Sequence, residues 1–214
     1  IRLAYPAGVE GLAPVTDPDA LAAVAAKYGA GERYLLYVGT LQPRKNLVML
    51  LRAFAALVAH SALPGDVRLV LAGRKGWLYD EIVAAAEDGA VEGRVVLPGY
   101  VPAADLPALL SGALAFVFPS LHEGFGLPVL EAMACGTPVI CSNASSLPEV
   151  AGDAALLVDP RDQDRWGEAL AKVSTRPALR EELRAKGLER AALFSWDRCA
   201  RAVLEALHEA AAEQ

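Results

Sequence analysis

Residues 114–142 read LAFVFPSLHEGFGLPVLEAMACGTPVICS and contain one complete structural unit. An unbroken apolar run ends at Pro119, and a second apolar run follows Pro138. Between them, residues 127–134 have the spacing of a helix, whose first turn accommodates Pro128. Apolar runs without alternation are typical of strands that are buried on both faces, as in a parallel sheet covered by helices. This stretch therefore predicts a strand, a helix and a second strand of a parallel sheet.

The same alternation of apolar runs and helical segments extends over most of the chain. The predicted strands are YLLYVG (34–39), VRLVLAG (67–73), RVVLPG (94–99), LAFVFPS (114–120), TPVICS (137–142) and ALLVDP (155–160). Between them, helices are predicted over residues 47–60, 79–87, 106–111 and 127–134, the first with Asn46 as its N-cap. Right-handed crossovers then give an α/β fold with a doubly wound, Rossmann-like parallel sheet.

The two ends of the chain lack this alternation. Within residues 1–30, the alanine-rich stretch 19–27 predicts a short helix, with Asp17 or Asp19 as its cap. After Pro160, three polar helices are predicted near residues 164–173, 177–193 and 196–212, and we expect them to pack around the sheet edge.

The composition is that of a folded, acidic protein. Hydrophobic residues make up 54% of the 214 residues and charged residues 21%, which excludes a disordered chain. The net charge of −6 argues against a nucleic acid partner held by phosphate neutralisation. Cys135, Cys141 and Cys199 form no CxxC pair, so we expect a reducing cytoplasm and small core cysteines. No apolar run reaches the roughly 18 residues of a transmembrane segment.

The loop after the fourth predicted strand has the features of an anion site. Gly124 and Gly126 permit close approach of the backbone, and Pro128 places a helix start beside them. No capping residue precedes that helix, so the amides of Val129 and Leu130 lack an obvious protein acceptor, and an anion would satisfy them. Alternatively, helix-dipole stabilisation alone explains an acidic residue in the first turn.

Two carboxylates, Glu123 and Glu131, can flank this helix start. Carboxylates accept hydrogen bonds from vicinal hydroxyls. Two of them around an anion site suit a ligand with a hydroxylated ring at each end and a negative group between, such as a nucleoside diphosphate sugar. In the alternative interpretation, Glu123 is a solvated loop residue and Glu131 is the acidic residue that the helix dipole favours.

Further polar residues follow the first three strands. Arg44 and Lys45 come after the first strand, and Arg74 after the second, where cations can neutralise phosphate. Tyr100 and Val101 follow the third strand and offer an aromatic ring and backbone groups to a base. The carboxyl ends of parallel strands are where ligands bind in such sheets. Taken alone, Arg44 and Lys45 are more typical of an ordinary basic surface pair, and Tyr100 and Val101 are equally usual in a buried turn.

Four segments together resemble the donor-binding half of the retaining GT-B glycosyltransferases, which include sucrose synthase and many bacterial mannosyltransferases. They are GTLQPRKN (39–46), GYV (99–101), the stretch 119–150 and GDAALLVDP (152–160). Glu123 and Glu131 match the family's pair of glutamates separated by seven residues. The resemblance covers most of residues 34–205 in the family's order.

The resemblance implies roles for individual residues. Lys45 would contact the donor diphosphate, Glu123 the hydroxyls of the transferred sugar, and Glu131 the ribose. The expected catalytic residues are Glu123, Lys45 and Arg44. The expected donor-binding residues are Thr40, Arg74, Tyr100, Val101, Gly124, Phe125, Gly126, Leu127 and Glu131, with phosphate oxygens on the amides of Phe125, Gly126 and Leu127. Many family members have Arg at the position of Thr40, and Arg44 would supply that charge here.

The resemblance also implies a reaction. The donor would be a nucleoside diphosphate hexose, with GDP-mannose favoured, and transfer would proceed with retention and without a metal or other cofactor. Asp162 and Asp164 are interpreted as helix-capping residues, not as metal ligands. His122 adjoins Glu123 and either lines the sugar pocket or is incidental.

The implied domain organisation is that of half an enzyme. Residues 1–30 would form an interdomain connector and residues 31–214 the nucleotide-sugar-binding domain, while the N-terminal domain that binds a glycan or lipid acceptor would be absent. We expect the isolated domain to be cytoplasmic, with membrane association through the absent domain left open, and nearly inactive. The alternative is a non-catalytic nucleotide-binding or regulatory Rossmann-like module, although no GxGxxG follows the first strand.

Overall fold

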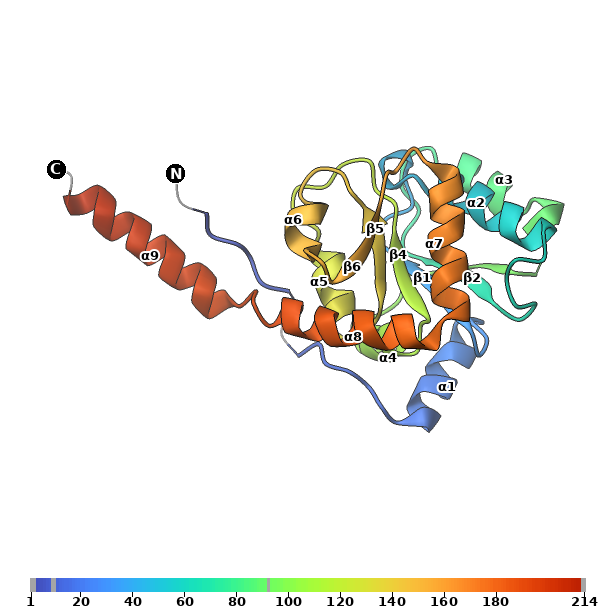
Figure 1. Cartoon of the computed structure of the whole chain (residues 1–214), viewed down its shortest axis with the longest axis horizontal. Helices are drawn as coiled ribbons and strands as arrows, with labels where there is room; N and C mark the ends of the chain where they lie inside the picture. Colours follow the sequence, from blue (N-terminus) through green and yellow to red (C-terminus); the bar gives the residue numbers. More distant parts are fainter. Residues whose placement is uncertain (1–2, 9–10, 92, 213–214) are drawn as a thin grey trace.

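The computed structural model describes residues 3–8, 11–91 and 93–212, and Figure 1 shows a twisted sheet with helices on both faces. The six strands are β1 (Tyr34–Val38), β2 (Arg68–Ala72), β3 (Val95–Gly99), β4 (Ala115–Phe118), β5 (Val139–Ser142) and β6 (Ala155–Val158). All neighbours pair in parallel, in the order β3-β2-β1-β4-β5-β6. The predicted doubly wound Rossmann-like sheet is confirmed.

Helices follow almost every strand, as the crossover rule requires. They are α1 (Pro18–Lys27), α2 (Leu47–Ala59), α3 (Asp80–Ala86), α4 (Leu106–Ser111), α5 (Leu127–Ala134), α6 (Leu147–Ala151), α7 (Gln163–Thr175), α8 (Pro177–Ala191) and α9 (Trp196–Ala212), with short 3-10 turns η1 (Pro43–Lys45) and η2 (Gly89–Val91). Helix α2 packs against α3 and α7 on one side of the sheet, while α5 packs against α6 and α8 on the other (Figure 1).

Burial separates the central strands from the edges. Residues of β1, β4 and β5 are almost all buried, as the apolar runs predict. The edge strands differ, because β3 is only half-buried and Leu157 of β6 is 38% exposed. A strand at the edge has a neighbour on one side only, so its apolar side chains are not enclosed. The expectation of burial on both faces therefore holds for the centre of the sheet and is wrong for its edges.

Helix caps were predicted with mixed success. Asp17 caps α1, since its side chain accepts a hydrogen bond from the amide of Asp19. Asn46 occupies the N-cap position of α2 but does not cap it. After the tight turn η1, Asn46 adopts a left-handed conformation with φ 58°, and its Nδ2 donates to the Pro160 carbonyl at 2.7 Å instead. The side chain thereby ties the start of α2 to the end of β6.

The C-terminal helices do not all pack around the sheet edge as expected. Helices α7 and α8 do pack on the domain, with Trp166 and Leu183 buried. Helix α9 instead extends away from the sheet on the same side as the N-terminal segment (Figure 1), and none of its described residues is buried. Its apolar side chains, including Trp196 and Leu207, remain exposed. Among the residues described, no helix combines the length and apolar character needed to cross a membrane.

Candidate functional site

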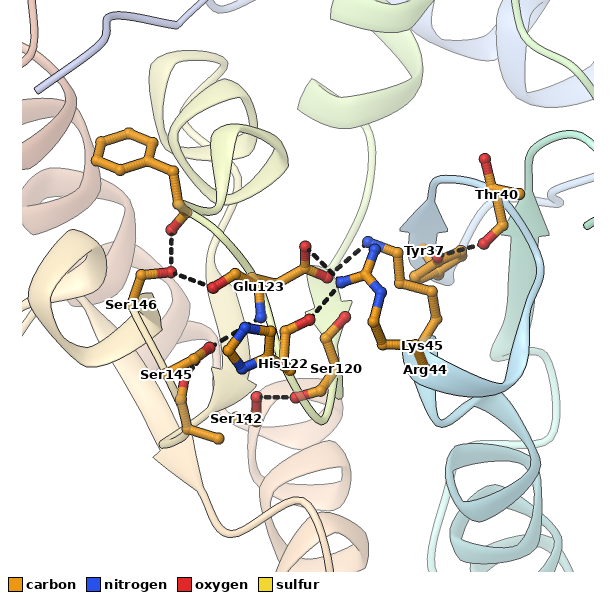
Figure 2. A network of polar contacts seen from close by, with 12 residues as sticks. Tyr37, Thr40, Arg44, Lys45, Ser120, His122, Glu123, Ser142, Ser145 and Ser146 are labelled. Atoms are coloured by element: carbon orange, nitrogen blue, oxygen red, sulfur yellow. Dashed lines mark hydrogen bonds and ion pairs between the residues drawn. The ribbon is translucent and has the colours of Figure 1, made fainter.

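The sheet order brings the loops after β1 and β4 together, and an ion-pair cluster joins them. Lys45 Nζ lies 2.5 Å from Glu123 Oε1, and Arg44 Nη1 lies 3.0 Å from Glu123 Oε2 (Figure 2). The side chains of Lys45 and Glu123 are each only 10% exposed. Arg44 also donates to the His122 carbonyl, and the amide of Leu121 donates to the Arg44 carbonyl at 3.0 Å. The three predicted catalytic residues thus form one contact group.

The electrostatics of this cluster follow from its burial. Burial raises the pKa of the Glu123 carboxyl, but hydrogen bonds from Lys45 and Arg44 outweigh it and hold that pKa below its ordinary value. Burial lowers the pKa of the Lys45 ammonium, and the hydrogen bond and charge of Glu123 oppose this effect. Lys45 Nζ also lies 4.8 Å from the centroid of the Phe118 ring. Glu123 is not the solvated loop residue of the alternative interpretation.

A serine pair before α6 supports the loop that carries Glu123. The amide of Glu123 donates to Ser145 Oγ at 2.9 Å (Figure 2). The single hydroxyl hydrogen of Ser146 faces two carbonyl acceptors, that of Phe125 at 2.7 Å and that of Glu123 at 3.1 Å. Neither serine was predicted as a site residue from the sequence. The signal was Ser145-Ser146 followed by Leu147-Pro148, a pattern typical of a helix start. Here the hydroxyls bind the neighbouring loop instead of capping α6.

At the start of α5, the predicted anion site is only partly right, because the backbone amides that lack an acceptor are not the predicted ones. The amide of Val129 is not free, because it donates to the Gly126 carbonyl at 2.9 Å, and the amide of Leu130 lies inside the helix, one turn beyond Gly126. Within the described residues, no protein acceptor is found for the amides of Phe125, Gly126 and Leu127. These three amides are the ones that the family resemblance implies as phosphate-binding groups. Gly126 has φ 114°, and an added Cβ would lie 2.7 Å from Leu147 Cδ2, so this turn requires glycine.

Glu131 lies deeper in α5 than the alternative interpretation assumed. Gly126 is the N-cap and Leu127 the first helical residue, which puts Glu131 in the second turn. The helix dipole acts mainly within the first turn, so it does not explain this residue. Glu131 is half-buried, burial raises the pKa of its carboxyl, and no cation pairs with it in the described part of the chain. A half-buried carboxylate without a partner is a candidate ligand-binding group.

Hydrogen bonds also join the loops after β1, β2 and β3. The amide of Leu41 donates to the Arg74 carbonyl at 2.9 Å, the amide of Gly76 donates back to the Leu41 carbonyl at 2.9 Å, and the amide of Gly73 donates to the Gly99 carbonyl at 2.8 Å. Thr40 is exposed beside them, and its carbonyl accepts from the Tyr37 hydroxyl at 3.1 Å. The candidate donor-binding loops form one continuous edge.

The predicted base-binding residues lie on this edge. The guanidinium carbon of Arg74 lies 4.7 Å from the centroid of the Tyr100 ring, which is 58% exposed. The side chain of Val101 is buried in the core, so it can offer a ligand its backbone only. Arg74 and Tyr100 therefore present a cation stacked on an open aromatic face.

The remaining candidates have structural roles. Asp162 caps α7, accepting from the Arg165 amide at 3.0 Å, as predicted. Cys135 and Cys141 are buried core residues, and burial raises their pKa values to about 11 and about 12. Across residues 3–8, 11–91 and 93–212, no cluster of three or more His, Cys, Asp or Glu side chains has the geometry to hold a metal ion.

We predict that Gly73→Ala disrupts this edge. Gly73 has φ 152°, and an added Cβ would lie 1.8 Å from the Gly39 carbonyl oxygen, so the loops after β1 and β2 would be forced apart. The free energy of unfolding should fall by about 2 kcal/mol or more. Urea denaturation provides the measurement, with Gly65→Ala as the matched control, because a Cβ at Gly65 meets nothing within 4 Å. Equal stabilities of the two variants would contradict the predicted contact.

Comparison with curated proteins identifies relatives of this chain. It is 45% identical over 170 residues to the O-antigen chain mannosyltransferase B of Escherichia coli. The matched region covers 79% of this chain and 44% of that protein. It is 36% identical over 225 residues to the D-inositol 3-phosphate glycosyltransferase of Saccharomonospora viridis, covering 98% of this chain and 52% of the relative. The chain thus spans about half the length of these relatives.

Solved structures share its architecture. Sucrose-phosphate synthase from Thermosynechococcus elongatus superposes with a TM-score of 0.80 at 29% identity, over 98% of this chain and 53% of the other. WaaG, at 21% identity with a TM-score of 0.75 over 92% of this chain and 54% of the other, shares the fold. The family described as "Glycosyl transferases group 1" matches residues 24–190. The chain therefore belongs to the group 1 glycosyl transferases, and its fold is that of a GT-B C-terminal domain.

Proposed function

We propose that this domain binds the nucleoside diphosphate sugar donor of a retaining hexosyltransferase, with GDP-mannose as the favoured donor. The observation that carries the proposal is the ion-pair cluster of Lys45, Glu123 and Arg44 on the loops after β1 and β4, in which the Lys45 and Glu123 side chains are each only 10% exposed. The chain is similar to the O-antigen chain mannosyltransferase B of Escherichia coli, and the name of that relative supports mannose over other hexoses. The acceptor, a glycan or lipid, would be bound by a further domain, and this domain alone would bind donor with little turnover.

The ion-pair cluster is suited to exchange partners when a diphosphate arrives. Two cations and one carboxylate leave it with a formal charge of +1 in a chain whose net charge is −6. Phosphate oxygens would compete for Lys45 and Arg44 through charge-assisted hydrogen bonds. Glu123 would then turn its carboxylate to the sugar hydroxyls. The same cations would stabilise the charge that develops on the departing diphosphate, so no metal is needed for this step.

The start of α5 supplies a second set of donors to the diphosphate. The amides of Phe125, Gly126 and Leu127 are consecutive, and the positive end of the helix dipole lies beside them. Gly126 lets the backbone approach a ligand closely. A diphosphate between these amides and Lys45 would be held from both sides without a metal ion.

The two ends of the donor have separate candidates. Glu131 would accept hydrogen bonds from the ribose hydroxyls, which would give this half-buried carboxylate its missing partners. Arg74 and Tyr100 would hold the base, by stacking and by hydrogen bonds from the guanidinium. An arginine paired with the O6 and N7 atoms of guanine is a common geometry, which also favours GDP.

The first test is calorimetry of the chain with GDP, UDP and ADP. We expect the diphosphate to supply most of the affinity and GDP to bind most tightly, with the same affinity in the presence of EDTA because the proposed site uses no metal. A ligand at a hundredfold excess over Kd should also stabilise the chain by about 2.7 kcal/mol. Absence of binding heat with all three nucleotides would refute the proposed function.

The second prediction concerns the phosphate contacts. Lys45→Met should weaken GDP binding about tenfold to a hundredfold, the range expected for a lost hydrogen bond to a charged group. Guanosine lacks phosphate, so its affinity should change little. Lys27→Met is the matched control. Lys27 lies at the end of α1, and its Nζ also pairs with a carboxylate, that of Asp105, at 2.6 Å. If both variants bind GDP like the wild type, Lys45 does not contact the diphosphate.

The third prediction separates ribose recognition from the rest of the site. Glu131→Gln should weaken GDP binding about tenfold, because a neutral amide accepts weaker hydrogen bonds from the ribose than a carboxylate does. Binding of 2′,3′-dideoxy-GDP, which lacks those hydroxyls, should be unaffected by the substitution. The control is Glu189→Gln, an exposed glutamate on α8. An equal loss of affinity for both nucleotides would exclude the ribose contact.

A further inference from the structure

Three aromatic rings from distant parts of the sequence meet at the loop that follows β4. The Phe125 ring centroid lies 6.1 Å from that of Tyr5 and 5.9 Å from that of Phe194, and the Tyr5 and Phe194 centroids are 5.9 Å apart. Both contacts of Phe194 are edge-on, a favourable geometry for aromatic pairs. Tyr5 lies in the N-terminal segment and Phe194 between α8 and α9. We call these three residues the aromatic triangle.

Phe125 is the side chain that can hold this loop. It lies between Gly124 and Gly126, and glycine has the greatest backbone freedom of any residue. Gly124 is exposed, and an added Cβ there would meet nothing within 4 Å, so no neighbouring group restrains it. The hydroxyl of Ser146 holds the Phe125 carbonyl from one side. The Phe125 ring is therefore the one side chain between these glycines through which packing can orient the loop amides.

A second set of contacts holds α6 from the same two chain segments. The Tyr5 hydroxyl donates to Glu149 Oε1, and Arg190 of α8 donates to the carbonyls of Glu149 (2.5 Å) and Val150 (2.9 Å). The Arg190 guanidinium carbon also lies 5.1 Å from the centroid of the Phe194 ring. Because the loop is bound to the serines before α6, the segments around Tyr5 and Phe194 restrain it both directly and through that helix.

We propose that Tyr5 and Phe194 are positioning residues for the donor loop, acting through Phe125. Neither reaches a reacting atom; each restricts the conformations of the loop, so that the amides of Phe125, Gly126 and Leu127 point to one phosphate position before the donor arrives. This role rests on the proposed function, since it concerns binding of the diphosphate. Donor affinity would therefore depend on two chain segments, the N-terminal segment that carries Tyr5 and the connection between α8 and α9 that carries Phe194.

A simpler role for the aromatic triangle is to cover apolar surface. In that case, loss of one ring would lower the overall stability of the domain and leave the loop and the nucleotide affinity unchanged. A positioning role instead predicts a local effect, because a loop held by few contacts opens independently of the core. Hydrogen exchange of the ligand-free chain distinguishes the two without any nucleotide.

The experiment compares amide hydrogen exchange of wild type, Phe194→Ala and Phe194→Tyr by mass spectrometry. In Phe194→Ala, which loses two ring contacts, the peptide covering residues 121–130 should exchange about three- to tenfold faster, while the peptide of β1 is unchanged. Phe194→Tyr keeps the ring and should restore the slow exchange. Tyr5→Ala, tested separately, should accelerate the same peptide. The controls are Leu3→Ala and Leu207→Ala, whose exposed side chains lie in the same two segments.

GDP affinity is the second measurement on the same proteins. It should fall about three- to tenfold in Phe194→Ala and return in Phe194→Tyr. Unchanged exchange at residues 121–130 in both alanine variants would overturn the inference, as would a uniform acceleration that includes β1. If the wild type binds no nucleoside diphosphate, the proposed function fails, and the positioning role in donor binding fails with it. If the wild type binds GDP but Phe194→Ala binds it equally well, only the positioning role fails.

Discussion

The ion pair between Lys45 and Glu123 is the interaction on which the site depends. The strand order places β1 beside β4, so the loops after these two strands meet at the point where the direction of sheet growth reverses. Removing two charges from water is unfavourable, and buried ion pairs often contribute little to stability. Lys45 Nζ and Glu123 Oε1 lie 2.5 Å apart, and each side chain is only 10% exposed, so the pair holds a cation and a carboxylate side by side, as the proposed donor site requires.

The surrounding contacts hold in place the loops that carry this ion pair. Loops after β1, β2 and β3 are joined by backbone hydrogen bonds, and Gly73 permits a contact with Gly39 that no larger residue could make. On the other side, Ser145 and Ser146 hold the backbone of the Glu123 loop. Binding groups that are already ordered lose little entropy when a ligand binds. Under the proposed function, these ordered groups would bind the diphosphate with little loss of entropy.

Several corrections share one cause, which is competition between neighbouring groups. A sequence pattern identified Asn46 as a helix cap, but the carbonyl of Pro160 offers its side chain a partner from another part of the chain. Ser146 directly precedes α6 but does not cap it, because its hydroxyl contacts the carbonyls of Glu123 and Phe125 in the loop after β4. Val129 finds an acceptor one turn back, in Gly126. For Asn46 and Ser146, a group distant in the sequence determines the outcome, whereas the acceptor for Val129 is only three residues away.

The sequence by itself determined the fold class, all six strands, most helices and the residues that carry the site's charges. It could do so because periodicity, glycine and proline act locally, and because Glu123, Glu131 and Lys45 stand in recognisable motifs. Only the tertiary structure decided which groups meet. It paired Glu123 with Lys45 and Arg44, and it left Glu131 half-buried with no cation beside it among the residues that the structure describes. It also directed α9 away from the sheet and joined Tyr5, Phe125 and Phe194. Those contacts connect residues far apart in sequence, and only chain packing brings them within reach of one another.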